Sequence, residues 1–164
     1  ARLKIVYEQG GIYLDLDVEI IKPFDDLLNN KAFFGFENDD YVASGLGFGG
    51  EKGSIAIKTL LDEYNQLLDG TNDVIGCPIL NTEGLVKLGL VKNGQLQKLT
   101  ECTVYPADYF NPYDDPTGRL NKTNNTYSIH WYAKSWMDKK SIIRSRLTQP
   151  LHRIFGTDFF RKKR

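Results

Sequence analysis

Apolar and polar residues alternate along the N-terminal part of the chain with two different periods. Residues 2–9 place apolar side chains at helical spacing and end at Gly10-Gly11, which is typical of a helix closed by glycine. From Ile12 to Ile21 the period changes, because from Leu14 onward apolar residues alternate strictly with acidic residues. A period of two predicts a strand, or a strand with a kink, that ends before Pro23.

The apolar segments farther along the chain predict a mixture of helices and strands. We expect helices over residues 24–28, 54–68, 78–88 and 141–155, the last interrupted or restarted at Pro150, and strands over 32–36, 102–105 and 127–131. Residues 106–125 are rich in Pro, Asp, Asn and Gly, which predicts an ordered surface loop. The glycine-rich run 45–50 fits either a flexible turn or a backbone that a ligand approaches closely. Together these elements predict an α/β domain.

The order of the elements adds a second expectation about the fold. The chain begins inside a predicted helix, and the obvious strands follow it. This order is that of the later part of a nucleotide-binding α/β fold. We therefore expect the strands that would complete the sheet to lie before Ala1.

The composition is that of a folded domain. Of the 164 residues, 41% are hydrophobic and 12% aromatic, which suffices for a sizeable core and excludes disorder over most of the length. No apolar run reaches the roughly 18 residues that a membrane-spanning helix needs, and the chain opens without a signal-peptide pattern. Cys77 and Cys102 belong to no Cys-x-x-Cys or Cys/His pairing. We therefore expect two reduced thiols and a cytoplasmic protein.

The net charge of zero hides an asymmetry between the two ends of the chain. Residues 134–164 carry ten Lys or Arg against two Asp, a net charge of +8, which leaves residues 1–133 at −8. We divide the chain into a catalytic region over 1–136 and a basic amphipathic extension over 137–164. Such an extension either lies on an anionic lipid surface at the inner face of the membrane or packs on the domain with a solvated basic face. No nucleic-acid recognition motif appears, and we expect no nucleic-acid partner.

Two aspartates stand in the best strand pattern of the chain. On a strand, Asp15 and Asp17 project from the same face about 7 Å apart, so the two carboxylates need a cation or open water between them. A hard cation such as Mg²⁺ or Mn²⁺ suits such a pair and fills its other positions with phosphates and water. A solvated acidic edge strand is the alternative. Because Asp is a poor strand former, its place here favours a functional site.

The block Gly-Gly-Ile-Tyr-Leu-Asp-Leu-Asp at residues 10–17 opens a longer pattern. It continues through Ile21-Lys22-Pro23, residues 32–37, Tyr105-Pro106, residues 109–112, Tyr127-Ser128-Ile129-His130 and Ser135-Trp136. Over residues 1–136 this pattern resembles the family 32 type glycosyltransferases, DXD-containing sugar-transferases that include yeast Golgi mannosyltransferases and many bacterial capsule and lipopolysaccharide enzymes.

The resemblance implies a fold, a reaction and its partners. The fold is GT-A-like, a Rossmann-like mixed sheet flanked by helices. The reaction is the retaining transfer of a hexose from a nucleotide-sugar donor (UDP- or GDP-hexose) to a hydroxyl of a glycan or lipid-linked acceptor, in surface polysaccharide or glycan synthesis. Its cofactor is Mn²⁺ or Mg²⁺, held between the DXD carboxylates and the donor diphosphate.

The resemblance also implies roles for individual residues. The metal ligands are Asp15, Asp17 and His130, although the histidine alone fits a structural role equally well. The donor contacts are Arg2, Tyr13, Asp15, Lys134, Ser135 and Trp136, of which the last two lie over the diphosphate as hydrogen-bond donors. We count Asp15, Asp17, Ser135 and Trp136 as the catalytic set.

Two other functions stay open on the sequence. A hydrophobic strand ending in Asp-x-Asp-x-Val also resembles the nucleophile strand of haloacid-dehalogenase-type phosphatases, in which the first aspartate, here Asp15, is phosphorylated. That chemistry requires a downstream lysine and a further acidic pair. The third alternative is a fragment that folds without catalysing a reaction.

Overall fold

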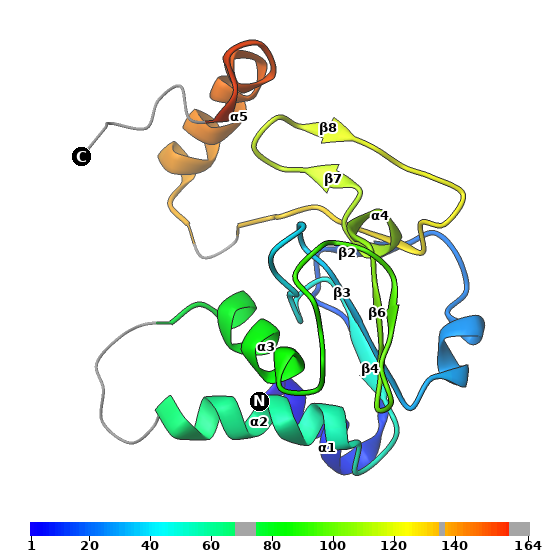
Figure 1. The fold of residues 1–164 in the computed structure, drawn as a ribbon. Coiled ribbons are helices and arrows are strands. Elements are labelled where there is room, and N and C mark those ends of the chain that lie inside the picture. The colour runs from blue at the N-terminus through cyan, green and yellow to red at the C-terminus, as the bar shows by residue number, and fades with distance from the viewer. Residues whose placement is uncertain (68–74, 135–136, 158–164) are drawn as a thin grey trace.

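A computed structural model of the chain describes residues 1–67, 75–134 and 137–157. Its centre is a five-stranded sheet (Figure 1). The strands lie in the order β1 (Gly11–Tyr13), β4 (Phe48–Gly50), β3 (Ala32–Gly35), β6 (Thr103–Tyr105) and β5 (Gln97–Lys98). Strands β3 and β6 are parallel, and the other neighbours in the sheet are antiparallel. Strands β1, β3 and β6 therefore run in one direction and end at the same edge of the sheet.

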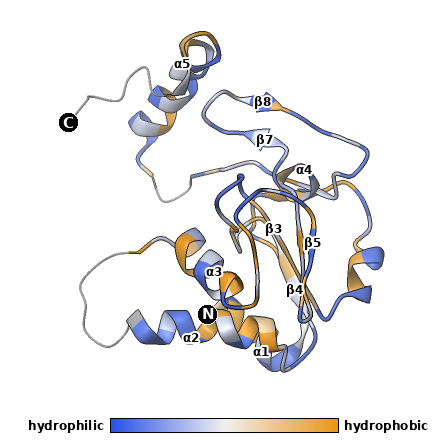
Figure 2. Cartoon of the chain, in the orientation of Figure 1, coloured by the Kyte–Doolittle hydropathy of each residue, from blue (hydrophilic) through white to orange (hydrophobic). Residues whose placement is uncertain are grey.

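Three helices cover one face of this sheet (Figure 1). They are α1 (Arg2–Gln9), α2 (Ile55–Leu67) and α3 (Cys77–Val86). Their apolar stripes meet the sheet in a core that includes Leu3 and Val6 of α1 and Ile57 and Leu60 of α2. Figure 2 shows this hydrophobic colouring where α1 and α2 approach the strands. The predicted α/β class is thus confirmed, as a mixed sheet flanked by helices.

The opposite face carries a second, aromatic core. Strand β3 supplies both cores, because Phe34 points into the first and Phe33 into the second, as the alternation of side chains on a strand requires. The ring of Phe33 stacks on Phe110 with 5.9 Å between centroids, and Phe24 meets both rings edge-on. Phe24 directly precedes the 3-10 helix η1 (Asp25–Asn29), and Phe110 is the last residue of α4 (Ala107–Phe110).

Two small sheets and a last helix complete the described part. Strand β2 (Val18–Ile20) pairs with β9 (Ser128–His130), and β7 (Tyr113–Asp114) pairs with β8 (Arg119–Leu120). Helix α5 (Lys139–Phe155) lies beside the β7–β8 hairpin and contacts it through polar groups. Gln149 reaches the Tyr113 hydroxyl, and Arg153 donates to the Thr117 carbonyl.

Three expectations from the sequence are wrong. The strand expected over 12–21 is broken: β1 joins the main sheet, β2 joins β9, and residues 14–17 turn between them. The expected loop 106–125 contains α4, β7 and β8. The expected interruption at Pro150 is absent from α5, which is continuous through the proline. Gln149 and Arg153 anchor the helix to the hairpin on both sides of the missing amide N–H.

The glycine-rich run 45–50 is not a flexible turn over its whole length, because its last three residues form strand β4. Gly49 pairs with Ile12 on one side and Phe33 on the other. A Cβ at Gly49 would lie 2.5 Å from the Phe33 ring and 3.1 Å from the Gly11 carbonyl oxygen. Glycine is therefore required here so that the aromatic ring can cross the strand.

We expect Gly49→Ala to lower the free energy of unfolding by about 1–3 kcal/mol, because the added methyl overpacks a fixed ring. Gly76→Ala is the matched control, since a Cβ there meets only Pro78 at 3.7 Å and its φ of −65° suits any residue. The control should change stability by less than about 0.5 kcal/mol. Urea unfolding measures both, and equal stability of the two variants would contradict this packing.

Candidate functional site

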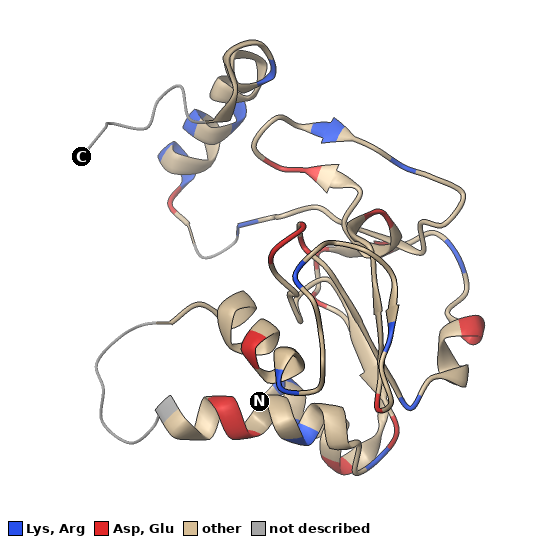
Figure 3. Cartoon of the chain, viewed as in Figure 1, with Lys and Arg blue, Asp and Glu red and all other residues tan. Residues whose placement is uncertain are grey.

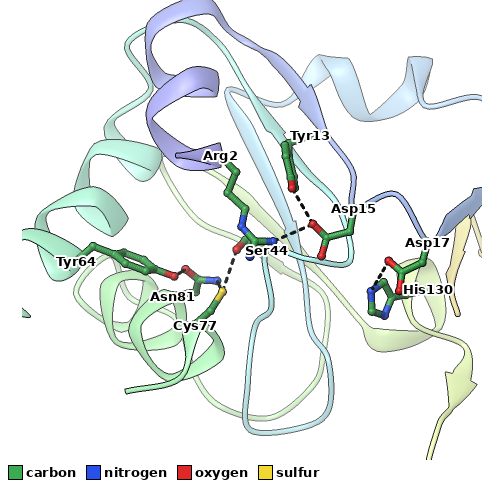
Figure 4. A network of polar contacts seen from close by, with 9 residues as sticks. All are labelled: Arg2, Tyr13, Asp15, Asp17, Ser44, Tyr64, Cys77, Asn81 and His130. Carbon is green, nitrogen blue, oxygen red and sulfur yellow. Dashed lines mark hydrogen bonds and ion pairs between the residues drawn. The ribbon is translucent and has the colours of Figure 1, made fainter. Parts of the chain in front are cut away.

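Asp15 and Asp17 lie in the turn between β1 and β2. The backbone N–H of Val18 donates to the Asp15 carbonyl over 3.1 Å, which closes a four-residue turn. The same-face strand geometry expected for the pair is therefore wrong. Leu16, one of the apolar residues of the alternating pattern, is fully exposed in this turn. The turn nevertheless brings the two carboxylates together (Figure 4).

Asp15 is held by two residues on its own side of the site. Arg2, the first residue of α1, donates from Nη1 to Asp15 Oδ1 over 3.0 Å, and the Tyr13 hydroxyl donates to the same oxygen over 2.8 Å. The Arg2 guanidinium also lies 5.4 Å from the centroid of the Tyr13 ring. Burial and the bond to Asp15 raise the pKa of Tyr13, so its phenol stays a donor.

A glycine keeps the space beside the other oxygen of Asp15 free. A Cβ at Gly45 would lie 2.7 Å from Asp15 Oδ2 and 3.6 Å from Arg2 Nη1. Any larger residue would displace the carboxylate or the guanidinium. At Gly45 the backbone thus passes close to the Asp15 carboxylate, whereas the predicted approach of a ligand to the glycine run stays a prediction.

Asp17 is held from the opposite side by the end of β9. Register between β2 and β9 places His130 opposite Val18, and His130 Nε2 lies 3.2 Å from Asp17 Oδ1. Just after β9, the backbone N–H of Ala133 donates to Asp17 Oδ2 over 2.8 Å. The backbone N–H of Trp131 donates to the backbone carbonyl of Asp17 over 3.0 Å. The chain after β9 therefore wraps around Asp17.

This wrapping costs backbone strain. Tyr132 and Lys134 have φ angles of 49° and 52°, in the left-handed region that residues with a Cβ rarely adopt. The ring of Tyr132 packs edge-on against His130 with 4.2 Å between centroids. The strained segment thus fixes both Asp17 and the imidazole.

The three predicted metal ligands meet at one point. One donor atom from each of Asp15, Asp17 and His130 lies within 4.8 Å of the others. Two carboxylates and an imidazole suit Mn²⁺, and the carboxylates also suit Mg²⁺. His130 Nδ1 is buried and has no hydrogen-bond partner within the described ranges. The donor set therefore fits a divalent cation.

The remaining predicted site residues divide into two groups. Lys134 turns away from the carboxylates, because its ammonium group pairs with Asp115 over 2.7 Å and donates to Ser145 over 2.9 Å. The structure therefore does not bring Lys134 together with Asp15. Ser135 and Trp136 lie outside the described residues, and their roles stay predictions.

A polar cluster next to Arg2 was missed by the sequence reasoning. It consists of Ser44 before β4, Tyr64 on α2, and Cys77 and Asn81 on α3 (Figure 4). Ser44 Oγ lies 3.1 Å from Cys77 Sγ, and the Asn81 amide donates to the same sulfur and accepts from Tyr64. The available signal was Asn81, a polar residue inside an apolar helix pattern.

The two cysteines are free thiols, as predicted. Cys102 is buried under the sheet, and this burial raises its pKa to about 12. Cys77 is only partly buried and opens α3.

The comparisons with known proteins agree with this geometry over a short stretch. A family model described as a glycosyltransferase sugar-binding region containing a DXD motif matches residues 1–34. No curated protein and no solved structure matches the chain. The matched stretch contains Arg2, Tyr13, Asp15 and Asp17, and it supports a glycosyltransferase-type function.

We expect Asp17→Asn to weaken Mn²⁺ binding by about tenfold or more, because it removes a charged ligand from a three-residue set. Asp25→Asn is the matched control, since Asp25 is an exposed carboxylate of η1 and should leave binding unchanged. Titration of free Mn²⁺ by electron paramagnetic resonance measures both variants. If the two variants bind Mn²⁺ equally well, the ion does not bind at Asp17.

Proposed function

We propose that this protein is a metal-dependent retaining glycosyltransferase that moves a hexose from a nucleotide-sugar to a hydroxyl of a glycan or lipid-linked acceptor. A role in the synthesis of surface polysaccharides or glycans is part of this proposal. Its main support is the cluster of Asp15, Asp17 and His130 beside Arg2. The family-model match over residues 1–34 covers three of these four residues.

In this proposal the residues of the turn bind and orient the donor. Asp15, Asp17 and His130 would hold a divalent cation, and the chemistry that such an ion would supply is Lewis-acid stabilisation of negative charge on a diphosphate leaving group. Arg2 stands beside Asp15, where its permanent charge also suits a phosphate oxygen. Tyr13 and the Ala133 N–H fix the two carboxylates. No base is assigned, since the departing phosphate can accept the proton of the acceptor.

The phosphatase alternative has less support. That chemistry needs a lysine near the phosphorylated aspartate. Among the described residues, the cation that pairs with Asp15 is Arg2, and Lys134 pairs with Asp115. Asp15 also follows an edge strand, β1, whose neighbour β4 is antiparallel. The observations therefore favour donor binding over phosphoryl transfer to Asp15.

We expect one class of nucleotide-sugar among UDP-, GDP- and CMP-sugars to raise the melting temperature in the presence of Mn²⁺. At a donor concentration about a hundred times Kd the shift should be roughly 5 °C. Asp17→Ala should abolish the shift, because it removes a metal ligand, and Asp25→Ala should keep it. A thermal-shift panel on the three proteins measures this.

Two outcomes of that panel would contradict the proposal. If no nucleotide-sugar shifts the wild type with either Mn²⁺ or Mg²⁺, the non-catalytic alternative stands. If the protein instead turns over a phosphatase reporter with Mg²⁺, and Asp15→Asn abolishes that turnover, the hydrolase alternative stands.

We further propose that α5 attaches the protein to an anionic lipid surface at the inner face of the membrane, in a cytoplasmic protein. Along α5, Ile143, Leu147, Leu151 and Ile154 recur at helical spacing and are 39–73% exposed. They lie on another side of the helix than Gln149, which contacts the hairpin. None of the described helices is long and apolar enough to cross a membrane.

The charges of α5 support an anionic partner. Lys139, Lys140, Arg144 and Arg146 are all exposed. In Figure 3 helix α5 carries the colour of Lys and Arg at several positions and that of Asp and Glu at none. An amphipathic helix with basic flanks lies in the headgroup region of anionic bilayers. Lipid-linked acceptors are found at such a surface, so attachment would bring the enzyme to them.

Leu147→Glu should lower the affinity for vesicles of phosphatidylcholine and phosphatidylglycerol by about tenfold, as measured by co-sedimentation. The substitution removes a leucine that would be buried in the bilayer and adds a negative charge that the anionic lipids repel. Leu28→Glu is the matched control on η1, where a leucine of similar exposure (61%) lies outside α5. Raised salt should weaken the binding of the wild type. Equal sedimentation of both variants, or a self-association that Leu147→Glu abolishes, would contradict the lipid partner.

A further inference from the structure

A cavity of about 610 Å³ opens at the carboxyl ends of the parallel strands β3 and β6. Glu37 and Asn38 line it just after β3, and Ala107 and Asp108 line it just after β6. Its size falls in the range of small-molecule sites in proteins, roughly 300–1,000 Å³. In open α/β sheets, ligands bind outside the carboxyl ends of the strands, and this cavity lies in that position.

The cavity shares its edge of the sheet with the metal ligands. Strand β1 runs in the direction of β3 and β6, and its carboxyl end leads into Asp15. The two places meet at Tyr132, whose side chain lines the cavity and whose ring packs against His130. One aromatic ring therefore separates the cavity from the predicted metal ligands.

The lining of the cavity has the chemistry of a sugar site. Carboxylates and an amide accept hydrogen bonds from hydroxyl groups, and the rings of Tyr113 and Tyr132 offer apolar faces. Asn111 Oδ1, in the wall of the cavity, is buried and accepts no hydrogen bond from the described residues. A buried acceptor left without a donor is costly, and this one lies in a residue of the cavity wall.

The charges of the lining favour one class of sugar. Its charged lining residues are Glu37, Asp108, Asp114 and Asp115, all of them acidic. Lys134, which is not part of the lining, balances Asp115, so Glu37, Asp108 and Asp114 carry the unbalanced negative charge. In Figure 3 these acids colour the loop after β3, α4 and strand β7. A uronate or a phosphate would meet like charges here, whereas the hydroxyl groups of an uncharged sugar would meet acceptors.

Tyr132 adds a donor to this set of acceptors. Its hydroxyl donates to Glu37 Oε1 over 3.3 Å. It stands on the side of the cavity that faces His130, where a hydroxyl group of a bound sugar would be closest to the metal ligands.

We propose that this cavity binds the acceptor of the proposed transfer and selects an uncharged sugar, such as a hexose or an N-acetylhexosamine, over an acidic one. The inference rests on the proposed function, because it takes Asp15, Asp17 and His130 as the donor side. It adds the location of the acceptor and the charge class that the site accepts.

The test compares sugar binding with donor binding in the same proteins. Saturation-transfer nuclear magnetic resonance should show binding of the methyl glycosides of glucose, galactose or N-acetylglucosamine, and binding of methyl glucuronide at least about tenfold weaker. Ala107→Phe, which fills the cavity, should abolish binding of the neutral glycosides. It should keep the Mn²⁺-dependent thermal shift with nucleotide-sugar, which also shows that the variant is folded.

A second, isosteric variant keeps the test decisive if Ala107→Phe fails to fold. Glu37→Gln should narrow the discrimination against methyl glucuronide by several-fold, since it removes one of the repelling charges. Glu51→Gln is its matched control, because Glu51 is exposed and follows β4, which ends at the opposite edge of the sheet. Donor binding should be unchanged in both.

The outcomes separate the inference from the proposed function. If donor binds with Mn²⁺ but no neutral glycoside binds, or if folded Ala107→Phe binds neutral glycosides as the wild type does, the cavity is not the acceptor site. If Glu37→Gln and Glu51→Gln prefer neutral glycosides over methyl glucuronide to the same extent, the proposed selection against acidic sugars is wrong. If no nucleotide-sugar binds the wild type, the proposed function itself fails.

Discussion

The repulsion between two carboxylates in one tight turn is the constraint that organises this site. Asp15 and Asp17 are brought together by a turn that ends β1 and begins β2, and each is then held from outside by a different part of the chain. Arg2 and Tyr13 hold the first, while His130 and the Ala133 N–H hold the second. One ligand atom from each of Asp15, Asp17 and His130 still lies within 4.8 Å of the others. A dication is the species that removes the remaining repulsion.

The fold supplies these partners from distant parts of the sequence. Pairing of β2 with β9 brings His130 next to Asp17 across more than a hundred residues, and packing of α1 on the sheet brings Arg2 to Asp15. The edge at which β1, β3 and β6 end then carries both the carboxylates and the acidic cavity. In the proposed function, this one edge of the sheet would bind the charged donor and, across the ring of Tyr132, the uncharged acceptor sugar.

Much of this arrangement was predictable from local pattern. The helix over 2–9, the strand at 32–35 and the helix in 55–67 were predicted closely, because each has a clear period and a glycine, proline or charge at its ends. The identity of Asp15, Asp17 and His130 as neighbours was also predicted, from a resemblance rather than from periodicity. The turn at 14–17 was not, since strict alternation is equally satisfied by two short strands in different sheets. The partners of Lys134 and the cavity depend on tertiary packing between the hairpin, α4 and the loop after β3, which no local pattern encodes.

If one divalent ion contacts both this trio of residues and the diphosphate of a nucleotide, pulsed electron paramagnetic resonance on Mn²⁺ bound with a nucleoside diphosphate should show this directly, through nitrogen coupling from an imidazole and phosphorus coupling from the nucleotide. We expect both couplings in the wild type, and in His130→Gln the loss of the nitrogen coupling alone. Phosphorus coupling in a spectrum that is identical for wild type, His130→Gln and Asp17→Asn would contradict this expectation, because the ion would then be bound by the nucleotide without these residues.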